Sequence, residues 1–301
     1  MDNFLFIFPS RTTEEKLIDN IIAIKNEETR SDAIKQLIRF ENNKNLPIYL
    51  WYSTGVMAGI LQEIITLYTN FTNKESEEKI KNIIHLFQII LENPNTRKAF
   101  IDSQILIFLY PFLTRKKSKL QISILYLIQR STQQHDSQFA EFIVKSELIP
   151  ILLKTLKKGS DISKKIICSI IMNILEIEVL FNYISELDYR LSAIILYLVS
   201  LLKDKSSSKF EPIIFKIFLK LSEIEKAKIL IKKELPEKIY EENYKKNLDE
   251  KNRDNLNNLL NSLGEKISGN ESEEKSKVIR NKKKIQNIEI VNSNSNNDLN
   301  N

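Results

Sequence analysis

The chain has 301 residues, is 42% hydrophobic and carries a net charge of +6, with only five glycines and seven prolines. Sandwiches, barrels and Rossmann folds need many tight turns and close backbone approaches, which use Gly and Pro. The composition therefore argues against those classes and predicts an all-α protein. The mild positive charge is compatible with nucleic acid contact without being evidence for it.

The predicted elements begin after a short tail, residues 1–12. Helical spacing of apolar residues predicts a first helix from Thr13 and a second helix that includes residues 33–40. Pro47 opens a third helix, which we expect to continue without a break through Ile65. A fourth helix spans residues 77–92, with its apolar residues in one stripe.

Four similar segments follow, each with a short helix, a polar turn and a long apolar helix. Their shared slot is separated by 42, 41 and 47 residues and holds Ile101, Ile143, Ile184 and Ile231. Armadillo and HEAT repeats have periods of about 40–47 residues, and such a unit buries its apolar face only against a neighbour. The pattern favours an armadillo-type right-handed superhelical α-solenoid. The alternative is a generic helical bundle with chance similarity.

A last helix, residues 249–263, is expected to cap the stack with four leucines, Leu256, Leu259, Leu260 and Leu263. The repeat domain is therefore predicted to span residues 13–264. Residues 265–301 are rich in Asn, Ser, Lys and Glu, a composition that buries too little apolar surface to offset its ordering entropy. We expect this tail to be disordered.

The sequence offers little for catalysis. The two histidines, His85 and His135, show no metal-ligand spacing, and no glycine-rich phosphate-binding motif is present. The single cysteine, Cys168, lies in an apolar run and is expected to be buried. We expect no enzyme activity, no metal and no cofactor.

The longest apolar run, residues 191–202, is shorter than the ~20 residues that cross a bilayer. The first residues also lack the charged and then apolar pattern of a signal peptide. We therefore expect a soluble intracellular protein without a membrane partner.

Three blocks carry a family resemblance: residues 50–64 (LWYSTGVMAGILQEI), 93–100 (NPNTRKAF) and 107–113 (IFLYPFL). Through them, and through further matches in order as far as residue 263, the chain resembles the Rcd-like, or Caf-forty, family (required for cell differentiation). That family is the armadillo subunit nine of the CCR–NOT deadenylase complex. The resemblance implies a non-catalytic adaptor that docks on the NOT scaffold and recruits regulators in mRNA deadenylation, decay and translational repression.

The partners implied by the resemblance are the NOT scaffold subunit and short linear motifs of mRNA-binding repressors. The implied location is cytoplasmic, with P-bodies and the nucleus as further compartments. The scaffold contact maps to Tyr52, Thr54 and Ala58, where the family usually has His and Phe at the first two positions.

Two peptide-receiving surfaces are also implied. A pocket for partner tryptophans maps to Arg190 and Asp188, with Tyr189 adjacent, and an aspartate cannot replace the tyrosine wall of the family. A groove for an amphipathic helix maps to Tyr126 and Ile166. The family has glycine at the first of these positions, and a tyrosine fills space that a helix needs. We expect this groove to be altered or closed.

Nucleic acid binding is the alternative function. Equivalent inter-helix loops of successive repeats carry basic residues that could line one edge, among them Arg115, Lys116, Lys117, Lys157, Lys158 and Lys164. The competing interpretation is a set of solvated loop lysines. An importin-like carrier is disfavoured because the chain has one tryptophan and few repeats. The sequence leaves open whether the chain forms a homodimer.

Overall fold

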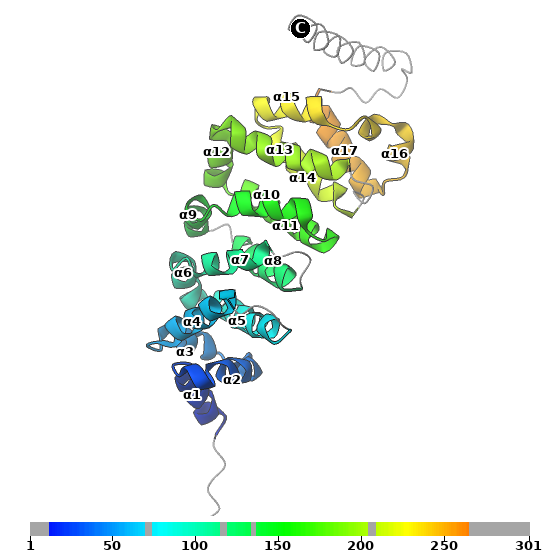
Figure 1. Ribbon diagram of the computed structural model, residues 1–301. Helices are drawn as coiled ribbons and strands as arrows, with labels where there is room; N and C mark the ends of the chain where they lie inside the picture. Colours follow the sequence, from blue (N-terminus) through cyan, green and yellow to red (C-terminus); the bar gives the residue numbers. More distant parts are fainter. Residues whose placement is uncertain (1–11, 70–73, 115–118, 134–136, 204–208, 265–301) are drawn as a thin grey trace, which may run out of the picture. The chain divides into compact units, whose positions relative to one another are not determined.

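The computed structural model describes residues 12–69, 74–114, 119–133, 137–203 and 209–264 (Figure 1). Every regular element within these ranges is a helix, as predicted. The first elements are α1 (Thr13–Ala23), α2 (Glu27–Leu37) and the 3-10 helix η1 (Ile38–Phe40). Thr12 caps α1 through a reciprocal pair of hydrogen bonds with Glu15, a capping box that fixes where the helix begins.

After η1 the helices recur in sets of three. The first helices of the sets are α3 (Leu46–Tyr52), α6 (Pro94–Asp102), α9 (Ser137–Lys145), α12 (Glu178–Glu186) and α15 (Glu225–Glu234). The second are α4 (Val56–Thr69), η2 with α7 (Ile105–Leu109, Tyr110–Leu113), α10 (Leu148–Lys158), α13 (Asp188–Leu202) and η4 with α16 (Glu237–Tyr240, Glu242–Lys246). The third are α5 (Lys74–Glu92), α8 (Lys119–Thr132), α11 (Asp161–Glu176), α14 (Glu211–Leu221) and α17 (Glu250–Ser262).

Helices of the same kind pack on one another from each set to the next. The third helices form one row, in which α5 packs on α8, α8 on α11 and α11 on α14 (Figure 1). The first helices form a second row, in which α3 packs on α6, α6 on α9 and α9 on α12. This nearest-neighbour stacking is the architecture of the α-solenoid that the repeat period predicts. By its contacts the chain divides into residues 1–259 and 260–301, and the stacking described here lies within the first unit.

The shared slot of the repeats is a core position. Its four isoleucines lie on the first helices of successive sets and are at most 2% exposed: Ile101, Ile143, Ile184 and Ile231. Burying such a side chain stabilises the fold by roughly 1.5–3 kcal/mol. The four leucines of the last helix are buried as well. Of the predicted N-terminal tail, residues 1–12, only Thr12 is described, as the cap of α1, and the C-terminal tail, residues 265–301, lies outside the described residues.

The prediction of one unbroken third helix is wrong, because the structure has two helices there. Helix α3 ends at Tyr52, and α4 begins at Val56. Between them Gly55 has a φ of +84°, a left-handed conformation that ends a right-handed helix and that L side chains rarely adopt. The apolar pattern continues on both sides of the turn, so helical periodicity alone does not show the break.

A recurrent joint ties some helices to the one before. Thr29 and Arg30 lie in the first turns of α2, where the Thr29 hydroxyl donates to the Ala23 carbonyl and Arg30 Nε to the Ile24 carbonyl. Thr96 and Arg97 repeat this pattern in α6, donating to the carbonyls of Ile90 and Leu91. Both pairs follow a capping asparagine three residues before the threonine. The side chains thereby satisfy carbonyls at a helix end, which have no partner within their own helix.

Candidate partner-binding surfaces

The three scaffold positions implied by the resemblance surround the break between α3 and α4. Tyr52, Thr54 and Ala58 are all exposed. Tyr52 is 62% exposed, and its hydroxyl donates to the Asn95 carbonyl at 3.2 Å, at the start of α6. The left-handed turn at Gly55 lies between these positions and sets the direction in which α4 leaves the site. The structure thus presents all three residues to solvent in one short segment.

Contacts between aromatic rings hold this segment in place. The Trp51 ring meets Phe100 of α6 edge-on, with centroids 6.1 Å apart, and Phe100 meets Phe87 of α5 at 5.1 Å. Contacts of this geometry add to simple burial, and here they join α3, α5 and α6.

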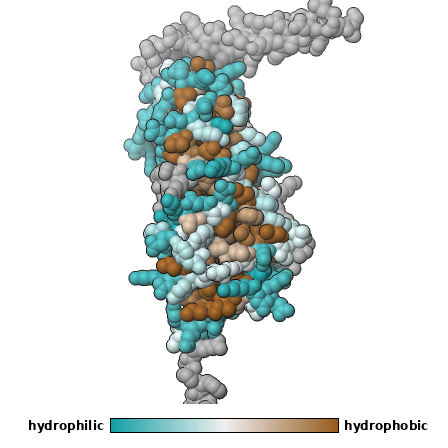
Figure 2. Space-filling model, turned by 90° about the vertical axis from the view of Figure 1, so that its left-hand side faces the viewer, coloured by the Kyte–Doolittle hydropathy of each residue, from teal (hydrophilic) through white to brown (hydrophobic). Residues whose placement is uncertain are grey.

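Farther along α4, Ile65 is 48% exposed, seven residues after Ala58 and therefore on the same helical face. The side of the molecule that carries α6, α9 and α12 shows apolar areas separated by polar ones (Figure 2).

The tryptophan-pocket positions lie at the joint between α12 and α13, and their side chains already have partners. The guanidinium carbon of Arg190 sits 3.7 Å from the Tyr183 ring centroid and 5.6 Å from that of Tyr189. Arg190 Nη1 also donates to the Tyr183 carbonyl at 2.9 Å. Asp188 pairs with Lys226 of α15 at 2.9 Å. The arginine therefore stacks on an aromatic ring of its own chain.

The two groove positions differ sharply in exposure. Tyr126 of α8 is 48% exposed, whereas Ile166 of the neighbouring α11 is 5% exposed and belongs to the core. Side-chain hydrogen bonds join α8 and α11: Gln129 Nε2 donates to Ser169 Oγ and Asn173 Nδ2 to Thr132 Oγ1, each at 2.8 Å, and Ser163 Oγ donates to Gln121 Oε1 at 2.9 Å. The first two make a polar surface at this joint, unlike the apolar trough that an amphipathic helix needs. The expectation that the groove is altered remains a prediction.

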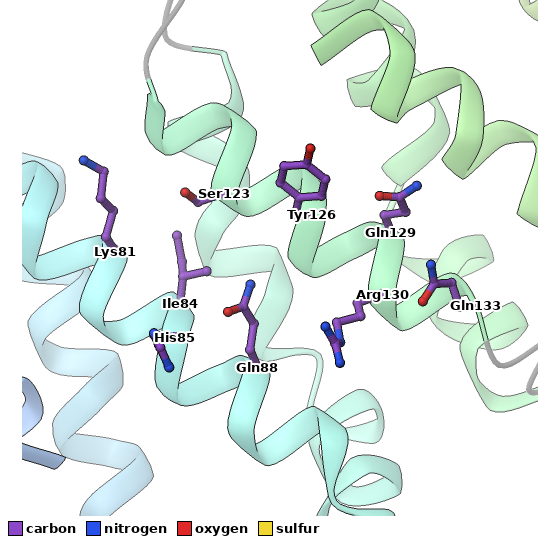
Figure 3. A pocket seen from close by; sticks show the side chains of 9 residues that line it. All are labelled: Lys81, Ile84, His85, Gln88, Ser123, Tyr126, Gln129, Arg130 and Gln133. Carbon is purple, nitrogen blue, oxygen red and sulfur yellow. The ribbon is translucent and has the colours of Figure 1, made fainter. Parts of the chain in front are cut away.

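Beside Tyr126 lies an open hollow of about 450 Å³, which was not predicted from the sequence (Figure 3). Side chains from α5 and α8, together with Gln133 just after α8, form its lining: Lys81, Ile84, His85, Gln88, Ser123, Tyr126, Gln129, Arg130 and Gln133. A signal for it exists in the sequence. Polar or aromatic residues recur at positions 81, 85 and 88 and at 123, 126, 130 and 133, the spacing of one exposed helical face.

The basic edge is described only in part. Arg115, Lys116 and Lys117 lie outside the described residues. Lys157 and Lys158 are exposed at the end of α10. Lys164 of α11 is half-buried, with its ammonium 5.7 Å from the Phe210 ring centroid. In the next repeat Lys209 pairs with Asp161 at 2.7 Å, so part of the positive charge along this edge is neutralised.

The cysteine and the described histidine are held by their neighbours in the fold. Cys168 is fully buried, as predicted, and burial raises the pKa of its thiol to about 12, an effect that the nearby Lys164 charge partly opposes. His85 Nε2 lies 2.8 Å from a carboxylate oxygen of Glu41, and His135 is outside the described residues. No group of three or more metal-ligating side chains occurs within the described ranges.

Within the described residues, no single helix is long and apolar enough to cross a membrane. The pair α11 and α12 meets the criterion of length and composition together, but the two helices are bent by 99°.

Comparison with known proteins identifies the relatives of this chain. The family model described as "Cell differentiation family, Rcd1-like" matches residues 20–267. Cell differentiation protein rcd1 of Schizosaccharomyces pombe is 30% identical over 230 residues, which cover 72% of this chain and 81% of that protein. Protein CAF40 of Saccharomyces cerevisiae is 26% identical over 212 residues, which cover 66% of this chain and 57% of that protein.

A solved structure supports the fold. A designed armadillo repeat protein in complex with the peptide (KR)4 superimposes with a TM-score of 0.56 over 82% of this chain and 99% of the designed one, at 15% sequence identity. At that identity the likeness bears on the fold alone. Together with the stacked rows of helices, it confirms the armadillo-type α-solenoid.

Proposed function

The chain belongs to the Rcd1-like cell differentiation family, and from that membership we propose that it is a non-catalytic adaptor subunit of a CCR–NOT deadenylase complex. In this role it docks on the NOT scaffold and recruits regulators of mRNA deadenylation, decay and translational repression. Its place of action would be the cytoplasm, including P-bodies, and the nucleus. The family match covers residues 20–267, nearly all of the repeat region that forms the stack.

One observation carries the docking part of the proposal. The block that resembles the family's scaffold contact is held in shape by Trp51 and Gly55, while Tyr52, Thr54 and Ala58 are exposed. A contact residue must be accessible, and a rigid support lowers the ordering cost of binding. The exposed Tyr52 ring supplies contact area where the family usually has histidine. Thr54 supplies less bulk than the family's phenylalanine, so the complementary scaffold surface should differ there.

The test is capture of the scaffold by the full chain. Affinity purification of the tagged protein from its own cells, followed by mass spectrometry, should recover the NOT scaffold and the deadenylases. Ala58→Arg places a charge in the docking surface and should reduce scaffold recovery at least tenfold. Tyr189→Ala changes a 67% exposed aromatic residue elsewhere and should leave recovery unchanged. Absence of the scaffold from the wild-type sample would refute the proposal.

Nucleic acid binding along the basic edge is a second candidate. It is favoured by the exposure of Lys157 and Lys158 at the end of α10, next to the connection to α11 of the same repeat. A backbone contact of this kind weakens steeply with salt, by about 0.7 units of log K per phosphate and per unit of log salt for single strands. Replacing both lysines with glutamine should then lower affinity for an oligouridylate and flatten that slope. No measurable binding by the wild type at low salt would remove this candidate.

A further inference from the structure

The charged side chains that line the α5–α8 hollow are all positive. Its lining contains the cations Lys81 and Arg130 and no carboxylate. In Figure 3 Lys81 lies toward one end of the hollow and Arg130 toward the other, with Gln88 and Tyr126 between them. A site with positive groups at both ends and no acidic group inside is complementary to a ligand that carries negative charge at its own two ends.

The acidic partners of these cations lie outside the hollow. Arg130 Nη2 is 2.8 Å from Glu92 Oε1, and Lys81 Nζ is 3.0 Å from Glu77 Oε1. Arg130 and Glu92 are each more than half exposed. A solvent-exposed ion pair such as Arg130–Glu92 contributes little to stability, so a ligand carboxylate can replace Glu92 at small cost. Lys81 and Glu77 are only 30% and 26% exposed, and Glu78 lies 3.8 Å from the same ammonium, so a ligand carboxylate at Lys81 competes with both.

The lining also offers hydrogen-bonding groups suited to a peptide backbone, with Gln88 between the two cations and Gln129 and Gln133 on the far side of Arg130 from Lys81 (Figure 3). Gln88, Gln129 and Gln133 each combine a carbonyl acceptor with an amide donor. Gln129 uses part of this capacity on Ser169. Arg130 pairs with Glu92, and from Lys81 to Glu92 a helix rises about 16 Å, which is the length of about five residues of extended chain. The hollow therefore matches a short extended segment in both length and polarity.

A helix and a nucleic acid strand fit less well. An amphipathic helix needs an apolar trough, yet the only aliphatic lining residue, Ile84, is 2% exposed. A nucleic acid strand needs cations along its whole path and stacking platforms. This hollow has cations only toward its ends, and its two rings are Tyr126 and His85, the second of which contacts the Glu41 carboxylate.

We propose that the α5–α8 hollow binds a short extended peptide segment with acidic side chains about five residues apart, the Tyr126 ring forming one wall. This inference rests on the adaptor function proposed above, for it names the chemistry of a recruited segment. Arg130 and Lys81 receive the two carboxylates, and the Gln88 amide receives the backbone between them.

The inference is tested with the purified full chain and fluorescein-labelled nonapeptides of Gly and Ser. One peptide carries Glu at positions 3 and 8, and a matched peptide carries Gln there. The Glu peptide should bind at least tenfold more tightly than the Gln peptide at low salt. Arg130→Gln and Lys81→Gln should each weaken that binding at least fivefold. Lys226→Gln, which also removes an exposed ion-paired lysine, should leave it unchanged.

Two results would overturn the inference: equal affinity for the Glu and Gln peptides, or tighter binding of an octauridylate with the same dependence on Arg130 and Lys81. Thermal unfolding of each variant verifies that it folds. Scaffold recovery by Arg130→Gln separates the two proposals, because it should match the wild type. If the wild type recovers the scaffold but does not bind the Glu peptide, only the present inference fails. If the scaffold is not recovered at all, the adaptor proposal fails.

Discussion

Single residues show where steric fit decides the fold. At Gly59 on α4 an added Cβ would lie 2.8 Å from the Ile24 carbonyl oxygen, which accepts the Arg30 Nε hydrogen bond. Nothing in the local sequence marks this glycine as different from one in a loop. Its requirement comes from close packing between segments 35 residues apart, which helical periodicity does not report.

Gly59→Ala should therefore destabilise the protein. Alanine gains up to about 1 kcal/mol of helix propensity over glycine, whereas forcing a backbone contact of this kind apart costs about 1–3 kcal/mol. We expect the free energy of unfolding to fall by about 1–2 kcal/mol in chemical denaturation. Thr66→Ala, at an exposed position of the same helix, should change it by less than about 0.5 kcal/mol. A Gly59→Ala protein as stable as the wild type would show that the packing relaxes freely.

The buried thiol of Cys168 gives a prediction for pH. Its pKa is about 12 in the folded chain against an ordinary value of 9.0. Between these values the unfolded state has lost the thiol proton and the folded state has not, so stability falls as pH rises. From pH 8 to pH 10 the wild type should lose about 1 kcal/mol more than Cys168→Ala in denaturant titrations. Parallel pH profiles for the two proteins would contradict this.

For the proposed partner-binding residues, the sequence predicts positions but not side-chain contacts. The resemblance locates Arg190, and the structure adds that its guanidinium stacks on Tyr183, seven residues earlier in the preceding helix. That contact depends on the angle between α12 and α13, which a motif does not encode. The hollow beside Tyr126 was missed for a similar reason, because its lining comes from two helices whose alignment is set by the stacking of α5 on α8.

Elements were predicted well where an apolar stripe is long and poorly where a turn is short. The stripe of the helix that ends at Glu92 is evident in the sequence, although α5 begins at Lys74 rather than at residue 77. The break at residues 53–55 was missed because apolar spacing continues on both sides of it. The Asn-x-x-Thr-Arg joint was also overlooked, although its two copies, residues 26–30 and 93–97, are visible in the sequence.

The joint predicts a difference between arginine and lysine. Arg97 donates from Nε to the Leu91 carbonyl at 2.7 Å and from Nη2 to the Glu92 carbonyl at 3.1 Å, at the negative end of α5. Arg97→Ala should lower the free energy of unfolding by about 1–3 kcal/mol. Arg97→Lys should recover less than half of that, because a compact ammonium lacks the planar fork that serves both carbonyls.

Lys98→Ala is the matched control for this joint, since Lys98 is the exposed neighbour on α6. It should leave the denaturation midpoint within experimental scatter of the wild type. Full recovery by Arg97→Lys would mean that charge near the helix end, rather than the geometry of the fork, holds α5 and α6 together.

The whole molecule is the level at which sequence was most informative. A period of about 40 residues and a slot filled by isoleucine are enough to predict stacked repeats, and the four slot residues are buried. Handedness and the exact course of the stack depend on small rotations between neighbours, which come from side-chain packing rather than from period. Because each set contacts its neighbours, stability should be a sum of local terms rather than a single all-or-none quantity.

Two slot variants test that expectation. Ile143→Ala and Ile231→Ala remove the same side chain from α9, which lies between α6 and α12, and from α15. Each should cost about 2–5 kcal/mol locally. Hydrogen exchange measured by mass spectrometry should show the Ile143→Ala effect spreading to α6 and α12. The Ile231→Ala effect should extend to α13, which packs on α15, while α5 and α8 keep wild-type rates. Equal acceleration in every helix of both variants would instead mean that the stack unfolds as one cooperative unit.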